Sequence, residues 1–304
     1  MSRFSGLFGR GKNDDSSSKS SSSKLDPERF GVSLKFLASL PIETDDPYET
    51  DPPFNAACEY VKKKTKKTIG YRSFAQFLFN NRKTRHLVKE QADVFISYAW
   101  SGGFEKTMSA LLEHFGDKED VFVWMDFAVV DQHAAAETNI QFDQWAETFR
   151  ENLKRIGKAV LVLTPGEKPI AITRAWCCFE WASIVQSEIP FEYCVTKEDV
   201  EAMISQMKNG MGTVAFDTLF AGINVEKAEA FKPSDQESIL ALMKEIGVVK
   251  VNDIVMKSLK GWLLEVNKEG LQRIGEQQTK ETAALFNARG ALHLVLVRVP
   301  YMLF

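Results

Sequence analysis

The sequence predicts an α/β protein with a doubly wound parallel sheet at its core and helical extensions on both sides. Between Ala92 and Val195, short apolar, β-branched or aromatic runs alternate with helical patterns, which is typical of βαβ units. These runs are nearly continuous in apolar residues, as a parallel sheet covered on both faces requires.

The chain begins with two segments that precede this core. Residues 1–24 are rich in serine and lysine and almost without large apolar residues, so burial cannot offset the entropy cost of ordering them. We predict a disordered tail there. Residues 25–90 carry helical patterns at Val32–Leu40 and Phe54–Val61, separated by the Pro/Asp-rich stretch 41–53, and a further cluster at Phe74–Phe79. This pattern predicts a helical lead-in.

The core of the predicted domain spans residues 92–195. Its four expected strands are Asp93–Tyr98, Val121–Trp124, Ala159–Leu163 and Phe191–Val195. The expected helices between them are Phe104–His114, Phe142–Arg155 and Ala175–Gln186.

The pattern continues beyond the core. We expect a helix at Lys197–Met207, a fifth strand at Thr213–Phe216, and helices at Asp235–Ile246 and Val251–Val266 that close a domain of residues 91–268. Residues 269–304 form a C-terminal tail that ends in an apolar run, 291–304. One interpretation of this run is that the chain stops partway through a further module.

Composition excludes several classes of function. A formal net charge of -3 gives no general basic field for nucleic acid, and the lysine run of residues 62–67 fits a solvated helix face. Four unevenly placed cysteines indicate reduced thiols, and four scattered histidines predict no metal site. The N-terminus lacks a secretory signal, and the run 291–304 is too short to span a bilayer. We therefore expect a cytoplasmic protein without a membrane span.

Two loops at the predicted ligand edge draw attention. Ligands of open α/β sheets bind beyond the carboxyl ends of the strands, where the strand order reverses. After the first expected strand comes a glycine-bearing turn, Ala99–Gly103, whose Ser101 and Gly102 precede a helix with backbone N–H groups suited to a phosphate. After the third, the loop 164–169 leads through Arg174 into the helix at Ala175.

Trp176 and Glu180 lie four residues apart on that helix and share one face. One interpretation places an aromatic ring beside a functional carboxylate. The other makes Trp176 a core residue and Glu180 an early-helix acid favoured by the helix dipole. Spacing leaves both open.

Four motifs together resemble the TIR (Toll/interleukin-1 receptor) domain family in order and spacing. They are DVFISYAW (93–100), VFVWMD (121–126), LVLTPG (161–166) and RAWCCFE (174–180). The resemblance covers about 105 residues and implies a flavodoxin-like fold.

The resemblance also implies a function. Many TIR domains cleave NAD+ at the nicotinamide–ribose bond, and the family's catalytic glutamate matches Glu180 here, with NAD+ as a substrate and no cofactor. A carboxylate suits this reaction because it stabilises the ribosyl cation. The residues expected at the NAD+ site are Tyr98, Trp100, Ser101, Gly102, Trp124, Asp126, Arg174 and Trp176. Alternatively, Tyr98 and Trp124 belong to the core and do not contact NAD+. For Trp100, the sequence favours neither interpretation.

A second function remains open from the sequence: a non-catalytic TIR signalling or adaptor module that acts by TIR–TIR self-association. The loop 127–138 lacks the glycine or proline that usually shapes the assembly loop of TIR domains. Hydrolase-triad, zincin, NTPase and Rossmann dehydrogenase functions lack their motifs in this chain.

Overall fold

The computed structural model describes residues 27–44, 51–65, 73–116, 120–133, 142–163, 169–208, 223–230 and 233–277. The chain divides into two compact units, Met1–Val160 with Gln186–Glu192, and Leu161–Val185 with Tyr193–Phe304. The predicted tail 1–24, the strand expected at Thr213–Phe216 and the apolar run 291–304 lie outside the described residues.

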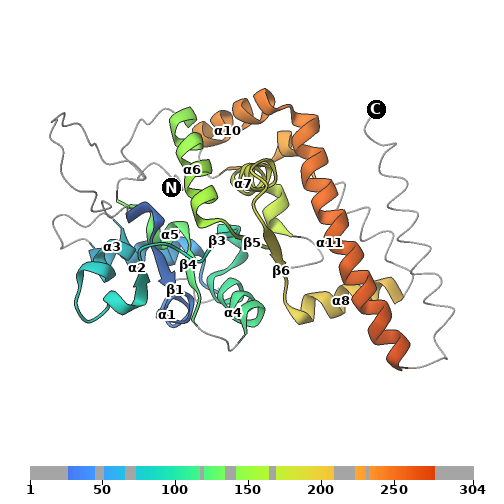
Figure 1. Ribbon diagram of the computed structural model, residues 1–304, viewed down its shortest axis with the longest axis horizontal. Helices are drawn as coiled ribbons and strands as arrows, with labels where there is room; N and C mark the ends of the chain where they lie inside the picture. The colour runs from blue at the N-terminus through green and yellow to red at the C-terminus, as the bar shows by residue number, and fades with distance from the viewer. Residues whose placement is uncertain are drawn as a thin grey trace. The chain divides into compact units, whose positions relative to one another are not determined.

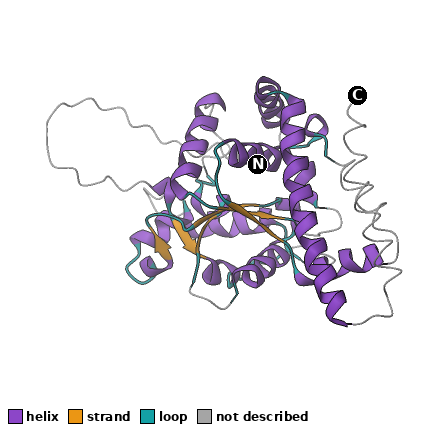
Figure 2. Ribbon diagram, turned by 45° about the vertical axis from the view of Figure 1, so that its right-hand side comes forward, coloured by secondary structure: helices purple, strands orange, loops and turns teal. Residues whose placement is uncertain are grey.

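The protein is α/β with a six-stranded mixed sheet of order β2-β1-β4-β3-β5-β6, drawn in orange in Figure 2. The strands are β1 (Gly31–Ser33), β2 (Val88–Lys89), β3 (Val94–Ser97), β4 (Phe122–Trp124), β5 (Ala159–Val162) and β6 (Phe191–Cys194). The last four match the strands expected from the sequence. Every residue of β3 and of β5 is buried, as their continuous apolar runs predicted.

The helices of the first unit are α1 (Leu34–Ala38), α2 (Phe54–Thr65), α3 (Phe74–Asn80), α4 (Phe104–Phe115), α5 (Asp126–Val129) and α6 (Phe142–Ile156). Of these, α2, α3, α4 and α6 follow the expected positions, whereas α5 forms where the sequence analysis expected the loop 127–138 (Figure 1). Helix α2 packs on α3 and α5, and α1 packs on α4. Phe54 of α2 joins an aromatic cluster with Tyr98, Phe104 and Phe127, at ring-centroid distances of 4.4, 5.3 and 5.7 Å from its own ring.

The lead-in differs from its prediction because part of it enters the sheet. The residues Gly31–Ser33 form β1, so the expected helix from Val32 is shortened to α1. Strand β1 pairs antiparallel with β4, Val32 opposite Val123, and antiparallel with β2 on its other edge. The predicted all-parallel sheet is therefore wrong at this edge, whereas β3 and β4 are parallel, with Val94 opposite Val123.

The second unit contains α7 (Ala175–Gln186), α8 (Lys197–Lys208), α10 (Pro233–Ile246) and α11 (Val248–Gln277). The long helix α11 packs on α8 and α10 (Figure 1). Tyr193 of β6 lies against Trp181 and Trp262, with ring centroids 6.0 and 5.6 Å from its own, and hydrogen-bonds Ser258. Burial raises the pKa of the Tyr193 phenol, so this contact carries a neutral hydroxyl. Among the described residues, no helix combines the length and apolar character needed to cross a bilayer.

Candidate functional site

Asp126 ties together the residues that follow β3 and β4. Its carboxylate is buried and accepts hydrogen bonds from the Tyr98 hydroxyl, from Trp100 Nε1 at 3.0 Å and from its neighbour Phe127 N at 3.0 Å. Parallel strands bring their carboxyl ends to the same edge of a sheet, which is why residues 28 positions apart meet here. Three of the predicted site residues therefore form one hydrogen-bonded cluster.

The aromatic residues of this edge differ in how much ring surface they leave open. Tyr98 and Trp124 are 1% and 3% exposed, and Trp124 Nε1 donates to the Glu28 carbonyl at 2.8 Å. Their burial favours the alternative in which both belong to the core. Trp100 is half-buried in the 3-10 helix η3 (Trp100–Gly102), so its indole keeps an accessible surface, and Ser101 beside it is exposed.

The N-terminus of α4 is already occupied by the chain's own carboxylate. Asp51 accepts hydrogen bonds from Glu105 N at 2.7 Å and Lys106 N at 3.2 Å, and the Pro52 carbonyl accepts from Phe104 N at 2.8 Å. Gly103, at φ +82°, makes room for Asp51, since a Cβ there would lie 2.0 Å from Asp51 Oδ2. The N–H groups that the sequence analysis offered to a phosphate are thus not free in this structure.

We expect Asp51→Ala to destabilise the protein by about 1–2 kcal/mol, because α4 loses a carboxylate cap that also complements its dipole. The N-cap residue Gly103 offers no side chain in its place. Urea unfolding measures the loss. Asp51→Asn, which keeps an acceptor oxygen without the charge, is expected to lose less, and an unchanged midpoint for the alanine variant would contradict the cap.

Helix α7 carries the predicted catalytic residue in a largely apolar setting. All residues from Ala175 to Ile184 are buried, and Glu180 among them is 2% exposed. Trp176, one turn before it, is 7% exposed and meets the Phe179 ring edge-on at 6.4 Å. The Trp176 indole therefore packs as a core residue. Packing does not explain the Glu180 carboxylate, because burying a carboxylate among apolar side chains costs free energy.

Cys178 and Arg174 precede Glu180 in the same part of the sequence. Burial, together with the charges at Cys177 and Glu180, raises the pKa of the Cys178 thiol far above its ordinary value, so it stays protonated and is a poor nucleophile. Arg174 is partly buried, and its guanidinium lies 3.9 Å from the Glu229 carboxylate. The backbone nearby is pinned by the hydrogen bond from Ala175 N to the Glu229 carbonyl at 3.0 Å.

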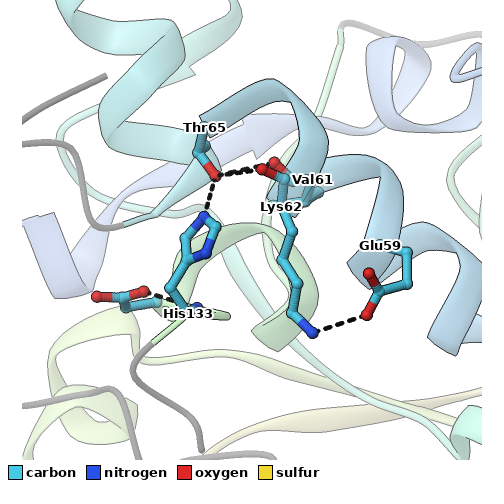
Figure 3. Close-up of polar contacts among 6 residues, drawn as sticks. Glu59, Val61, Lys62, Thr65 and His133 are labelled. Atoms are coloured by element: carbon cyan, nitrogen blue, oxygen red, sulfur yellow. Dashed lines mark hydrogen bonds and ion pairs between the residues drawn. The ribbon is translucent and has the colours of Figure 1, made fainter. Parts of the chain in front are cut away.

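The structure contains a polar contact that the sequence analysis missed (Figure 3). Thr65 Oγ1, at the end of α2, donates to the Val61 carbonyl at 2.9 Å, and His133 Nε2 lies 2.8 Å from the same oxygen. The Thr65 hydroxyl and the His133 ring nitrogen are therefore hydrogen-bond partners. The contact fixes the start of the loop after α5 against α2, and no sequence motif links residues so far apart.

The predicted site residues fall into the two units, with Tyr98, Trp100, Ser101, Gly102, Trp124 and Asp126 in the first and Arg174, Trp176 and Glu180 in the second. The loop 164–168 lies outside the described residues. That all nine contribute to one NAD+ site remains a prediction of the sequence. Within the described ranges, no three His, Cys, Asp or Glu side chains are grouped so as to hold a metal ion.

Comparison with protein-family models, with curated proteins and with solved structures finds no match for this chain.

Proposed function

We propose that this protein is a TIR-like NAD+ nucleosidase with a flavodoxin-like core, in which Glu180 is the catalytic residue. The observation that carries the proposal is the buried Glu180 carboxylate, 2% exposed, one turn after Trp176 on a helix whose other buried residues, apart from Ser183, are apolar. Burying a carboxylate costs free energy that a purely structural position would not need, so such groups concentrate at functional sites.

The strand order supports the fold assignment. Within the sheet, β4, β3, β5 and β6 follow one another in the order expected of a flavodoxin-like core, and the order reverses between β3 and β5. Strands β1 and β2 extend the sheet beyond β4 and leave that order intact.

The proposed reaction breaks the bond between the nicotinamide nitrogen and the ribose carbon. The bonding electron pair leaves with the ring, which departs neutral because it carried the positive charge. The Glu180 carboxylate stabilises the ribosyl cation that remains, and water captures the cation and gives up a proton to that carboxylate. A carboxylate shielded from solvent acts more strongly on the developing charge than one exposed to water.

The test is the release of nicotinamide from NAD+ by the purified full chain at high protein concentration. We expect Glu180→Gln, which keeps the side-chain length, to lower the rate by at least about 100-fold. Glu198→Gln on α8 is the matched control, because Glu198 is exposed, and it is expected to retain the wild-type rate. A wild-type protein that releases no nicotinamide would overturn the proposal in favour of the non-catalytic TIR module.

A further inference from the structure

Helix α7 carries a second buried polar group close to Glu180. The Ser183 side chain is 0% exposed, and its hydroxyl has no hydrogen-bond partner. A buried hydroxyl without a partner costs free energy, and few such groups persist in folded proteins without a functional reason. The Ser183 hydroxyl is thus a hydrogen-bond donor that the folded protein does not use.

Helical geometry places this donor beside the carboxylate. Trp176, Glu180 and Ser183 stand at positions i, i+4 and i+7, which fall within an arc of about 60° at about 100° per residue. Residues three apart on one face have Cβ atoms about 5–6 Å from each other, so a serine hydroxyl there reaches a glutamate carboxylate by rotation of side chains alone.

The other unpartnered polar atom of α7 does not share this arrangement. Trp181 Nε1 is also buried without a hydrogen-bond partner, but Trp181 follows Glu180 directly and therefore points about 100° away from it around the helix, where it packs against Tyr193. Only Ser183 combines an uncommitted donor with a place on the face of Glu180.

We propose that Ser183 is a positioning residue whose hydroxyl donates a hydrogen bond to the Glu180 carboxylate when NAD+ is bound. The hydrogen bond holds the carboxylate ionised and oriented toward the ribose as positive charge develops. This inference rests on the proposed NAD+ nucleosidase function and assigns a further residue to the same site.

The experiment measures kcat and KM for nicotinamide release from NAD+ by the wild-type protein, Ser183→Ala and Ser183→Thr. We expect the alanine variant to lose about tenfold or more in kcat with KM within about twofold, because the hydrogen bond acts mainly on the transition state. Ser183→Thr keeps the hydroxyl and is expected to recover most of kcat. Ser238→Ala on α10 is the control, since that exposed hydroxyl already donates to the Ser234 carbonyl.

A stability measurement separates positioning from a structural role. Removing a hydroxyl that has no partner should leave the urea midpoint of Ser183→Ala unchanged or higher, whereas loss of a structural hydrogen bond would lower it. If the wild type cleaves NAD+ through Glu180, two results for Ser183→Ala would overturn the role of Ser183 and leave the proposed function standing. These results are a lowered urea midpoint and an unchanged kcat. A wild-type protein that does not cleave NAD+ would overturn the proposed function, and this inference with it.

Discussion

Asp126→Ala is expected to destabilise the protein by about 3–5 kcal/mol. The substitution removes the acceptor of three donors at once: the Tyr98 hydroxyl, Trp100 Nε1 and Phe127 N. The Tyr98 residue is only 1% exposed, so water cannot replace the lost acceptor there. Each buried donor left without an acceptor costs about 1–3 kcal/mol, and water reaches Trp100 more readily than Tyr98. Urea unfolding followed by tryptophan fluorescence measures the difference.

Two companion variants test this explanation of the Asp126 effect. Asp126→Asn keeps an acceptor oxygen in the same place and should lose less than half as much. Adding Tyr98→Phe to Asp126→Ala should recover part of the loss, because the hydroxyl that lacked an acceptor is then gone. If the free energy of unfolding of Asp126→Ala is within about 1 kcal/mol of the wild-type value, the hydrogen bonds to Asp126 contribute little to stability. The packing of Tyr98 against Phe54 would then hold this edge by itself.

The elements with strong sequence patterns could be predicted. Strands β3, β4 and β5 are short continuous apolar runs, and α4, α6 and α7 follow them with helical spacing, so local sequence and tertiary burial agree. Strand β1 could not be predicted in this way. Its last two residues, Val32 and Ser33, match the start of the expected helical pattern, and only pairing with β4 makes them part of a strand.

The sequence predicts candidate site residues, and the structure adds contacts among some of them that the sequence does not predict. Strand-end positions predicted that Tyr98, Trp100 and Asp126 matter, but their shared hydrogen bonds depend on side-chain geometry. Asp51 lies 54 residues from its partner Glu105, and no local signal connects the two. Ser183 is different, because its spacing of three from Glu180 was visible in the sequence and only its lack of a partner needed the structure.

Gly31→Ala is expected to cost about 3 kcal/mol, because β1 approaches two backbone segments too closely to admit a side chain. A Cβ at Gly31 would lie 2.6 Å from the Ala92 Cα and 2.9 Å from the Phe122 carbonyl oxygen, so backbone and not a flexible side chain must move. The hydrogen bond from Leu34 N to the Val121 carbonyl, 2.9 Å long, would stretch with it. Urea unfolding gives the cost, and faster hydrogen exchange at Leu34 locates it.

Gly261→Ala is the matched control because the same change meets no obstacle there. Gly261 lies within α11, and no atom outside its chain neighbours and its own helix backbone comes within 4 Å of the added Cβ. Alanine is favoured over glycine inside a helix by about 0.5–1 kcal/mol. The two glycine-to-alanine variants should therefore move stability in opposite directions. Equal midpoints for the two would mean that β1 is not held against Ala92 and Phe122, and that the extra antiparallel edge of the sheet is not part of the folded core.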